Sequence, residues 1–153
     1  MPLKIRMFFA QSMIASLLAF VGAAAYAAEP GLAVLMERMQ TYSHKLQLSV
    51  AARNAPLAGF YLHELEETAE SIIENIASYD EQPVGELTRQ MFMPALELLE
   101  DAVDDADWSA GDQRFTAMLE ACNGCHVASG HGQIRIVPAS GNPFAQDFSV
   151  QPD

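Results

Sequence analysis

Apolar residues recur at intervals of three and four along most of this chain, the spacing that places them on one face of an α-helix. The pattern predicts helices over residues 30–54, 56–79, 86–105 and 109–126, and no alternating β-type run occurs before residue 133. Amphipathic helices joined by short connections are typical of a helical bundle. The sequence therefore predicts an all-α fold, an antiparallel four-helix bundle followed by an irregular C-terminal tail.

Capping residues and prolines set the expected helix boundaries. Asn54 can cap the second helix, with Pro56 at its first position. Pro94 interrupts the third helical stretch, where it either kinks the helix or marks its effective start. Ser109 can cap the last helix.

The N-terminus has the pattern of a secretory signal peptide. Lys4 and Arg6 precede an uncharged apolar run over 7–24, and residues 25–27 form a small-x-small cleavage sequence. We therefore expect export to the periplasm with cleavage after Ala27, which leaves no stable membrane span. An uncleaved anchor is the alternative, because an apolar run of about 18 residues can just span a bilayer.

A five-residue motif near the end of the chain carries the candidate chemistry. Cys122, Asn123, Gly124, Cys125 and His126 spell C-x-x-C-H, and these are the only two cysteines. Two thiols at this spacing can each form a thioether with a vinyl group of one porphyrin, and the following histidine can bind the iron. The motif predicts one covalent haem c with His126 as the proximal ligand. Haem attachment outside the bacterial inner membrane agrees with the expected export.

Other uses of the cysteine pair require features that the chain lacks. A dithiol redox centre usually follows a strand and opens a helix, and no such pattern surrounds the motif. A structural zinc site would need two more ligands at suitable spacing, and no other cysteine supplies them. Haem attachment is therefore the favoured interpretation.

The 153-residue chain is strongly acidic, with 8 Lys and Arg against 20 Asp and Glu and a net charge of −12. Cleavage leaves 6 basic against 20 acidic residues, a net charge of −14, in one small domain over 28–126 and a tail over 127–153. This charge argues against nucleic acid as a partner. It suits a basic redox partner protein, although general solubility explains it equally well.

A four-helix bundle with a single C-x-x-C-H on its last helix resembles the class II c-type cytochromes, the cytochrome c-prime group and its low-spin relatives. The similarity covers residues 30–126, and only the pentapeptide is specific. The resemblance implies that Cys122 and Cys125 form the thioethers, that His126 is the proximal ligand and that the chain can form a homodimer. Val127 follows the motif where a basic residue is usual, and the tail is additional, so a divergent branch is expected.

The sixth position on the iron separates electron transfer from gas binding. By the resemblance, low-spin members take a methionine from the first helix, where Met36 and Met39 are the candidates. Helical phase favours Met39, which lies near the middle of the apolar arc, although core packing is the commoner role of a methionine. His44 lies roughly opposite that arc and is the alternative ligand if the helix bends.

Side chains outside the motif add further expectations. Arg53, near the end of the first helix, could contact a haem propionate or pair with a glutamate of the second helix. Trp108 is expected to pack at the start of the last helix. Phe144 and Phe148 suggest that the tail docks on the bundle or on a partner, with disorder as the alternative.

The expected function is that of a periplasmic electron carrier with one covalent haem and with Met39 or His44 as the sixth iron ligand. A five-coordinate haem protein that binds NO or CO is one alternative, and a haem-bearing accessory subunit of a larger complex is another. An enzyme is not expected, because no cluster of acid, base or nucleophilic groups lies beside the motif.

Overall fold

The computed structural model describes residues 30–152. The expected leader over 1–27 and its cleavage after Ala27 lie outside these residues. Within the described part of the chain, no helix is both long and apolar enough to cross a membrane.

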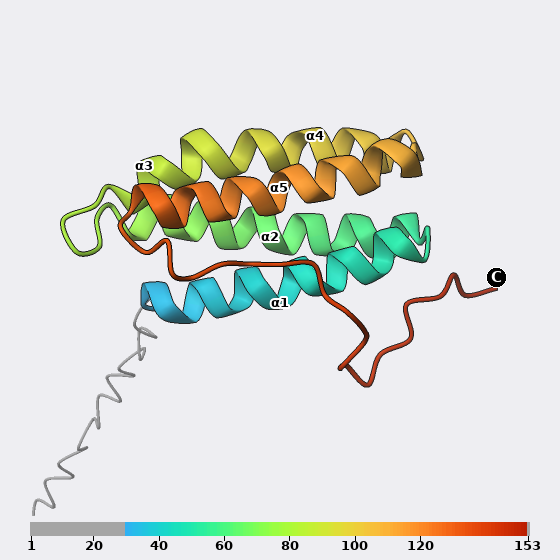
Figure 1. Cartoon of the computed structure of the whole chain (residues 1–153). Coiled ribbons are helices and arrows are strands. Elements are labelled where there is room, and N and C mark those ends of the chain that lie inside the picture. Colours follow the sequence, from blue (N-terminus) through green and yellow to red (C-terminus); the bar gives the residue numbers. More distant parts are fainter. Residues whose placement is uncertain (1–29, 153) are drawn as a thin grey trace, which may run out of the picture.

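The described chain is all-helical, as the sequence predicts. Helices pack side by side as a bundle, and the chain after the last helix runs back along the seam between α5 and α1 (Figure 1). Across residues 30–152 the only bridge of β type is an isolated one between Tyr79 and Gln82. In chain order the helical elements are α1 (Leu32–Ala51), α2 (Ala55–Asn75), α3 (Val84–Leu87), the π-helical turn η1 (Thr88–Phe92), α4 (Met93–Asp104) and α5 (Trp108–Ala128).

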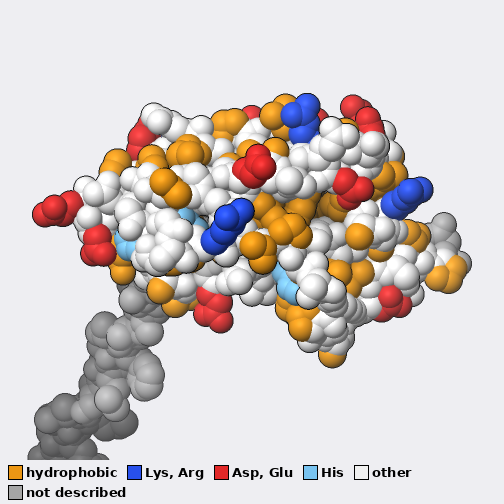
Figure 2. Space-filling model, in the orientation of Figure 1, with side chains coloured by type: hydrophobic (Ala, Val, Ile, Leu, Met, Phe, Trp, Pro, Cys, Tyr) orange, Lys and Arg blue, Asp and Glu red, His pale blue; other side chains and the backbone are white. Residues whose placement is uncertain are grey.

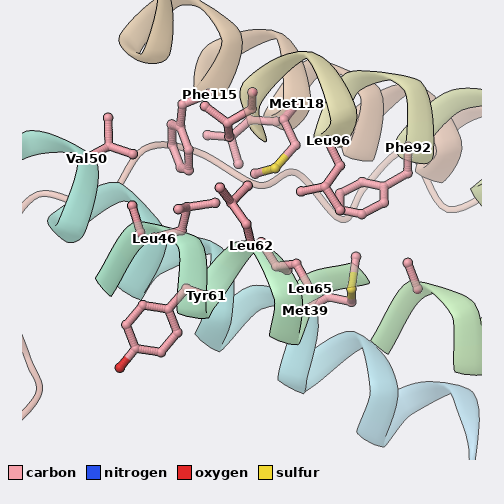
Figure 3. Packing of buried hydrophobic residues seen from close by; sticks show 14 of the residues in the cluster. Met39, Leu46, Val50, Tyr61, Leu62, Leu65, Phe92, Leu96, Phe115 and Met118 are labelled. Carbon is pink, nitrogen blue, oxygen red and sulfur yellow. The ribbon is translucent and has the colours of Figure 1, made fainter. Parts of the chain in front are cut away.

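One continuous apolar core holds these helices together. Leu46 of α1, Leu65 and Ile72 of α2 and Leu99 of α4 are completely buried. Figure 3 shows side chains of α1 and α2 meeting those of α4 and α5 in this core. Burying one such side chain contributes about 1.5–3 kcal/mol. Burial of the apolar face is therefore what places the last helix against the first.

The second helix is capped by Asn54 as the sequence predicts, but it begins at Ala55, so Pro56 is its second residue and not its first, and it ends earlier. The Asn54 side chain accepts a hydrogen bond from Leu57 N at 3.2 Å, and Pro56 lies in the first turn. The helix stops at Asn75 and not at Tyr79. Tyr79 instead exchanges two backbone hydrogen bonds with Gln82, both 2.9 Å. Tyr79 therefore lies in a tight turn after α2 and not in the helix.

The third helical stretch passes Pro94 without a break. It begins at Val84, two residues before the predicted start, and α3, η1 and α4 follow one another directly. The wider π turn over 88–92 comes just before Pro94, which then lies in the first turn of α4. Proline has no backbone N–H, and a residue in the first turn of a helix does not need one. The helical stretch therefore continues past Pro94.

The last helix is capped by Asp107, and the prediction of Ser109 as the cap is wrong. The Asp107 side chain accepts a hydrogen bond from Ala110 N at 3.0 Å, so the helix begins at Trp108. It also continues beyond His126 to Ala128. Trp108 packs against the core as expected.

Gly130 ends α5 and reverses the chain. Its φ of 80° is left-handed, a conformation that glycine adopts without steric cost. Gly130 N donates to Val127 O at 3.1 Å and His131 N donates to His126 O at 2.6 Å, which together form a Schellman motif. The reversal brings the following residues back beside the C-x-x-C-H turn.

The chain that follows α5, here called the C-terminal segment, lies against α1 and α2. Phe148 is 7% exposed and belongs to the core cluster, and its ring lies 6.4 Å from that of Tyr61. Phe144 packs edge-on against His44, with 4.9 Å between ring centroids. Tyr61 Oη donates a hydrogen bond to Gln146 Oε1 at 2.8 Å. Aromatic burial and hydrogen bonds thus both fix this segment.

The Asn54 side chain links the start of α2 to this segment. We therefore expect that removing this side chain strongly lowers the stability of the protein. Its Nδ2 donates to Phe148 O at 3.1 Å and Ser149 O at 3.0 Å, in addition to the cap. Asn54→Ala should lower the free energy of unfolding by about 2–3 kcal/mol, roughly 1 from the cap and 1 from each lost bond at most. Urea unfolding measures this change.

Asp107→Ala is the matched control, because Asp107 caps α5 and makes no bond to the C-terminal segment. Its expected cost is about 1 kcal/mol. Equal losses in the two variants would contradict the contribution of the segment contacts.

Candidate functional site

Two adjoining cavities lie where the end of α5 meets the start of α1 and the α3–η1 turn. Their volumes are about 200 and 360 Å³, and cofactor pockets commonly occupy about 300–1,000 Å³. Six residues line both cavities: Ala33, Met36, Thr88, Cys125, His126 and Ile134. The motif predicted to carry the chemistry therefore lies on the wall that joins the two spaces.

The wall of the larger cavity combines the motif with apolar side chains from several elements. Cys122 joins Cys125 and His126 there, together with Met39 of α1 and Ile72 of α2. Its remaining lining residues are Glu37, Gln40, Ser43, Phe92 and Ile136, besides those shared with the smaller cavity. An apolar pocket with a few polar groups at its edge is the usual form of a cofactor site.

The His126 ring is held by a hydrogen bond that leaves its other nitrogen available. Nδ1 lies 2.8 Å from the carbonyl oxygen of Ile134. A carbonyl oxygen only accepts, so Nδ1 carries a proton, and in the neutral imidazole Nε2 then keeps its lone pair. Metal-binding histidines commonly have their second nitrogen bonded in this way. The arrangement fits a histidine that binds iron through Nε2.

The two thiols are half-buried beside the larger cavity. Burial raises the pKa of Cys122 to about 12, and the nearby Cys125 adds to this rise. Burial also raises the pKa of Cys125. A dithiol redox centre needs a lowered thiol pKa, because the thiolate is the attacking species. These pKa shifts oppose the dithiol interpretation and fit thiols that line a mainly apolar cofactor cavity.

Close packing fixes the turn between the cysteines. A Cβ atom on Gly124 would lie 2.8 Å from Met91 Cε. Cys125 Sγ lies 3.8 Å from Met91 Sδ and donates a hydrogen bond to Leu87 O at 3.4 Å. The motif thus packs against Leu87 of α3 and Met91 of η1, and a side chain at position 124 would require the flexible end of Met91 to move.

The first helix brings both of its candidate methionines to the cavities. Met39 is 8% exposed and lines the larger cavity. Met36, one turn earlier, is half-buried and lines both cavities. Helical phase alone favours Met39, whereas the structure places both methionines in the lining of the larger cavity, together with the motif.

His44 and Arg53 are not brought to the site. His44 Nε2 lies 2.8 Å from Gly141 O and so carries a proton, and His44 is absent from both cavity walls. Arg53 lies past the end of α1 with a left-handed φ of 56°. It is 17 residues beyond Met36, which is about 25 Å along a helix. The suggested contact of Arg53 with a haem propionate finds no support in this placement.

The remaining histidines have different surroundings. His131 lines the smaller cavity, where its Nδ1 donates to Ser129 O at 2.9 Å and its Nε2 lies 3.9 Å from Asp80 Oδ2. His63 is exposed and lies 3.4 Å from Glu67 Oε1 on the surface of α2. In the described part of the chain, no group of three or more His, Cys, Asp or Glu is arranged to hold a metal ion.

Sequence reasoning missed the contribution of the residues after α5. Ile134 and Ile136 line the larger cavity, and the Asn123 side chain bonds to the backbone of Ile136. Gly130 was the available signal, because a glycine just past a helix commonly reverses the chain. Thr88 was also missed, since a π turn has no clear sequence signature.

The residues present fit a covalent haem: two half-buried thiols and one imidazole with an available Nε2 line the same mainly apolar cavity. Comparison with known proteins found no matching family model, no similar curated protein and no similar solved structure.

Proposed function

We propose that this chain is an exported c-type cytochrome that binds one covalent haem and carries single electrons between redox partner proteins. The observation that carries the proposal is the arrangement of Cys122, Cys125 and His126 on one apolar cavity wall, with His126 Nδ1 already bonded to Ile134 O at 2.8 Å. When bound, the haem supplies an iron that gains and loses one electron.

The residues of the chain have distinct tasks in this proposal. Cys122 and Cys125 hold the porphyrin through thioethers, and His126 Nε2 binds the iron. Apolar residues of the cavity wall exclude water, which helps to set the reduction potential. A methionine of α1, Met36 or Met39, closes the sixth position, and a closed position favours electron transfer over gas binding.

The proposed architecture is an antiparallel four-helix bundle with the haem on its last helix, similar to the class II c-type cytochromes. Two neighbouring placements support it: the motif lies at the end of α5, and the methionines lie near the start of α1. Cofactor sites in bundles are built from such facing helices.

The acidic surface suits a basic redox partner. Acidic side chains are spread over the face seen in Figure 2, and Lys and Arg are few there. The whole chain carries a net charge of −12. Opposite charge on a partner would speed the encounter, and added salt would slow it.

An absorption spectrum of the purified mature protein tests the proposal. We expect sharp α and β bands in the reduced form that do not shift when carbon monoxide is added, because the sixth position is already occupied. A band shift with carbon monoxide would contradict the electron-carrier assignment and favour binding of NO or CO. A protein without haem absorption would contradict haem binding altogether.

A further inference from the structure

Residues 130–148, here called the strap, return from the end of α5 and cross the motif before they reach α1. Side chains on the helices hold the strap at successive points. Asn123 bonds to Ile136, Gln47 to Ala139 and Tyr61 to Gln146. The strap thus forms one wall of the larger cavity through Ile134 and Ile136.

Asn123 makes a two-way contact with the strap backbone. Its Nδ2 donates to Ile136 O at 2.9 Å, and its Oδ1 accepts from Ile136 N at 2.7 Å. A side-chain amide has a donor and an acceptor on one planar group, so it can pair with both backbone groups of a residue. Aspartate offers only acceptors and leucine offers neither.

The same stretch of the strap also supplies the hydrogen-bond acceptor for His126, the candidate iron ligand. Ile134, two residues before Ile136, accepts a hydrogen bond at its carbonyl oxygen from His126 Nδ1 at 2.8 Å. Asn123 and His126 lie three residues apart on one face of α5. A short piece of backbone is therefore bonded at both ends to neighbouring side chains of the motif.

We propose that Asn123 is a positioning residue for His126. By fixing Ile136 it holds the Ile134 carbonyl in place, and this carbonyl keeps the proton on Nδ1 and leaves the Nε2 lone pair available on a side chain that lines both cavities. The inference rests on the proposed haem site. It assigns a role to a position between the cysteines that the attachment chemistry does not itself require.

Gln47 provides a matched control within the strap. Its Nε2 donates to Ala139 O at 3.3 Å and its Oε1 accepts from Ala139 N at 2.7 Å, the same pattern as Asn123. Gln47 is on α1 and lines neither of the two cavities. Loss of this contact loosens the strap without touching the part that bonds to His126.

The test compares reduction potentials of the haem-loaded wild type, Asn123→Ala and Gln47→Ala. A hydrogen bond from Nδ1–H makes the imidazole a stronger donor and stabilises ferric iron, so its loss should raise the potential. We expect an upward shift in Asn123→Ala, faster solvent exchange of the Nδ1 proton by NMR, and no shift in Gln47→Ala. An unchanged potential in Asn123→Ala, or equal shifts in both variants, overturns the proposal.

A second pair of variants decides the matter if Asn123→Ala fails to retain haem. Ile136→Pro removes the N–H that Asn123 accepts, and Ile136→Val keeps it, while the motif stays intact in both. The proposal expects the potential of Ile136→Pro to exceed that of Ile136→Val, and equal values refute it.

A wild-type chain without haem would contradict the proposed function but still test the positioning role. The nitrogen NMR shifts of His126 then report its tautomer directly. The Nδ1–H form should predominate in the wild type and give way to a mixture in Asn123→Ala. An unchanged tautomer would rule the role out.

Discussion

Replacing Cys122 and Cys125 together by alanine will produce a chain that retains no covalent haem. The wild-type protein should keep its haem through denaturation and acid extraction, because thioether bonds survive both. These are the only cysteines in the 153 residues, so no other thiol can substitute. Each single replacement leaves one possible thioether and should reduce the covalently bound haem without the complete loss of the double variant.

The histidine of the motif offers a second test of the same site. His126→Ala removes the imidazole whose Nε2 faces the iron in our proposal, and we expect the haem spectrum to change. His63→Ala is the control, since His63 lies exposed on α2 beside Glu67. Haem that is fully extractable from the wild type, or that resists denaturation and acid extraction in the double cysteine variant, would contradict covalent attachment through this motif.

The thiol environment explains why the cysteine replacement should report haem attachment and not a lost redox dithiol. The raised pKa of Cys122, about 12, keeps that sulfur protonated at neutral pH. A protonated thiol attacks disulfides slowly. A pair of free, half-buried cysteines beside an apolar cavity is therefore poorly suited to thiol exchange and well suited to hold a cofactor.

The helices were predictable because their signals are local. Apolar residues at three- and four-residue spacing identified α1, α2, the stretch around α4, and α5. The cap at Asn54 was also correct. Errors arose where two local signals compete: Asp107 satisfies the free N–H groups of α5 before Ser109 can, and the turn at Tyr79–Gln82 ends the apolar pattern of α2.

The candidate site was only partly predictable because its second half comes from distant residues. Cys122, Cys125 and His126 could be named from their spacing alone. The position of Ile134 beside His126 depends on the left-handed Gly130, whose consequence is visible only in three dimensions. Arg53 was misplaced for a related reason, since its own left-handed backbone removes it from the face of α1.

Replacing both Met36 and Met39 by leucine should convert the haem to a five-coordinate form that binds carbon monoxide. Leucine keeps a similar volume, so the cost in stability should stay below about 1.5 kcal/mol for each exchange. The lost thioether sulfur is then the main change. We expect a broad high-spin spectrum, a band shift with carbon monoxide and a lower reduction potential, because an axial methionine raises the potential.

The single variants Met36→Leu and Met39→Leu show which of the two methionines is the sixth iron ligand. Helical phase favours Met39, which lines only the larger cavity, whereas Met36 lines both cavities. Met93→Leu is the control, because Met93 packs against the core and lines neither cavity. If the double variant keeps the wild-type spectrum, neither methionine of α1 is the sixth ligand. His44 would then have to give up its bond to Gly141, the aromatic contact with Phe144 and its place beneath the strap to reach the iron.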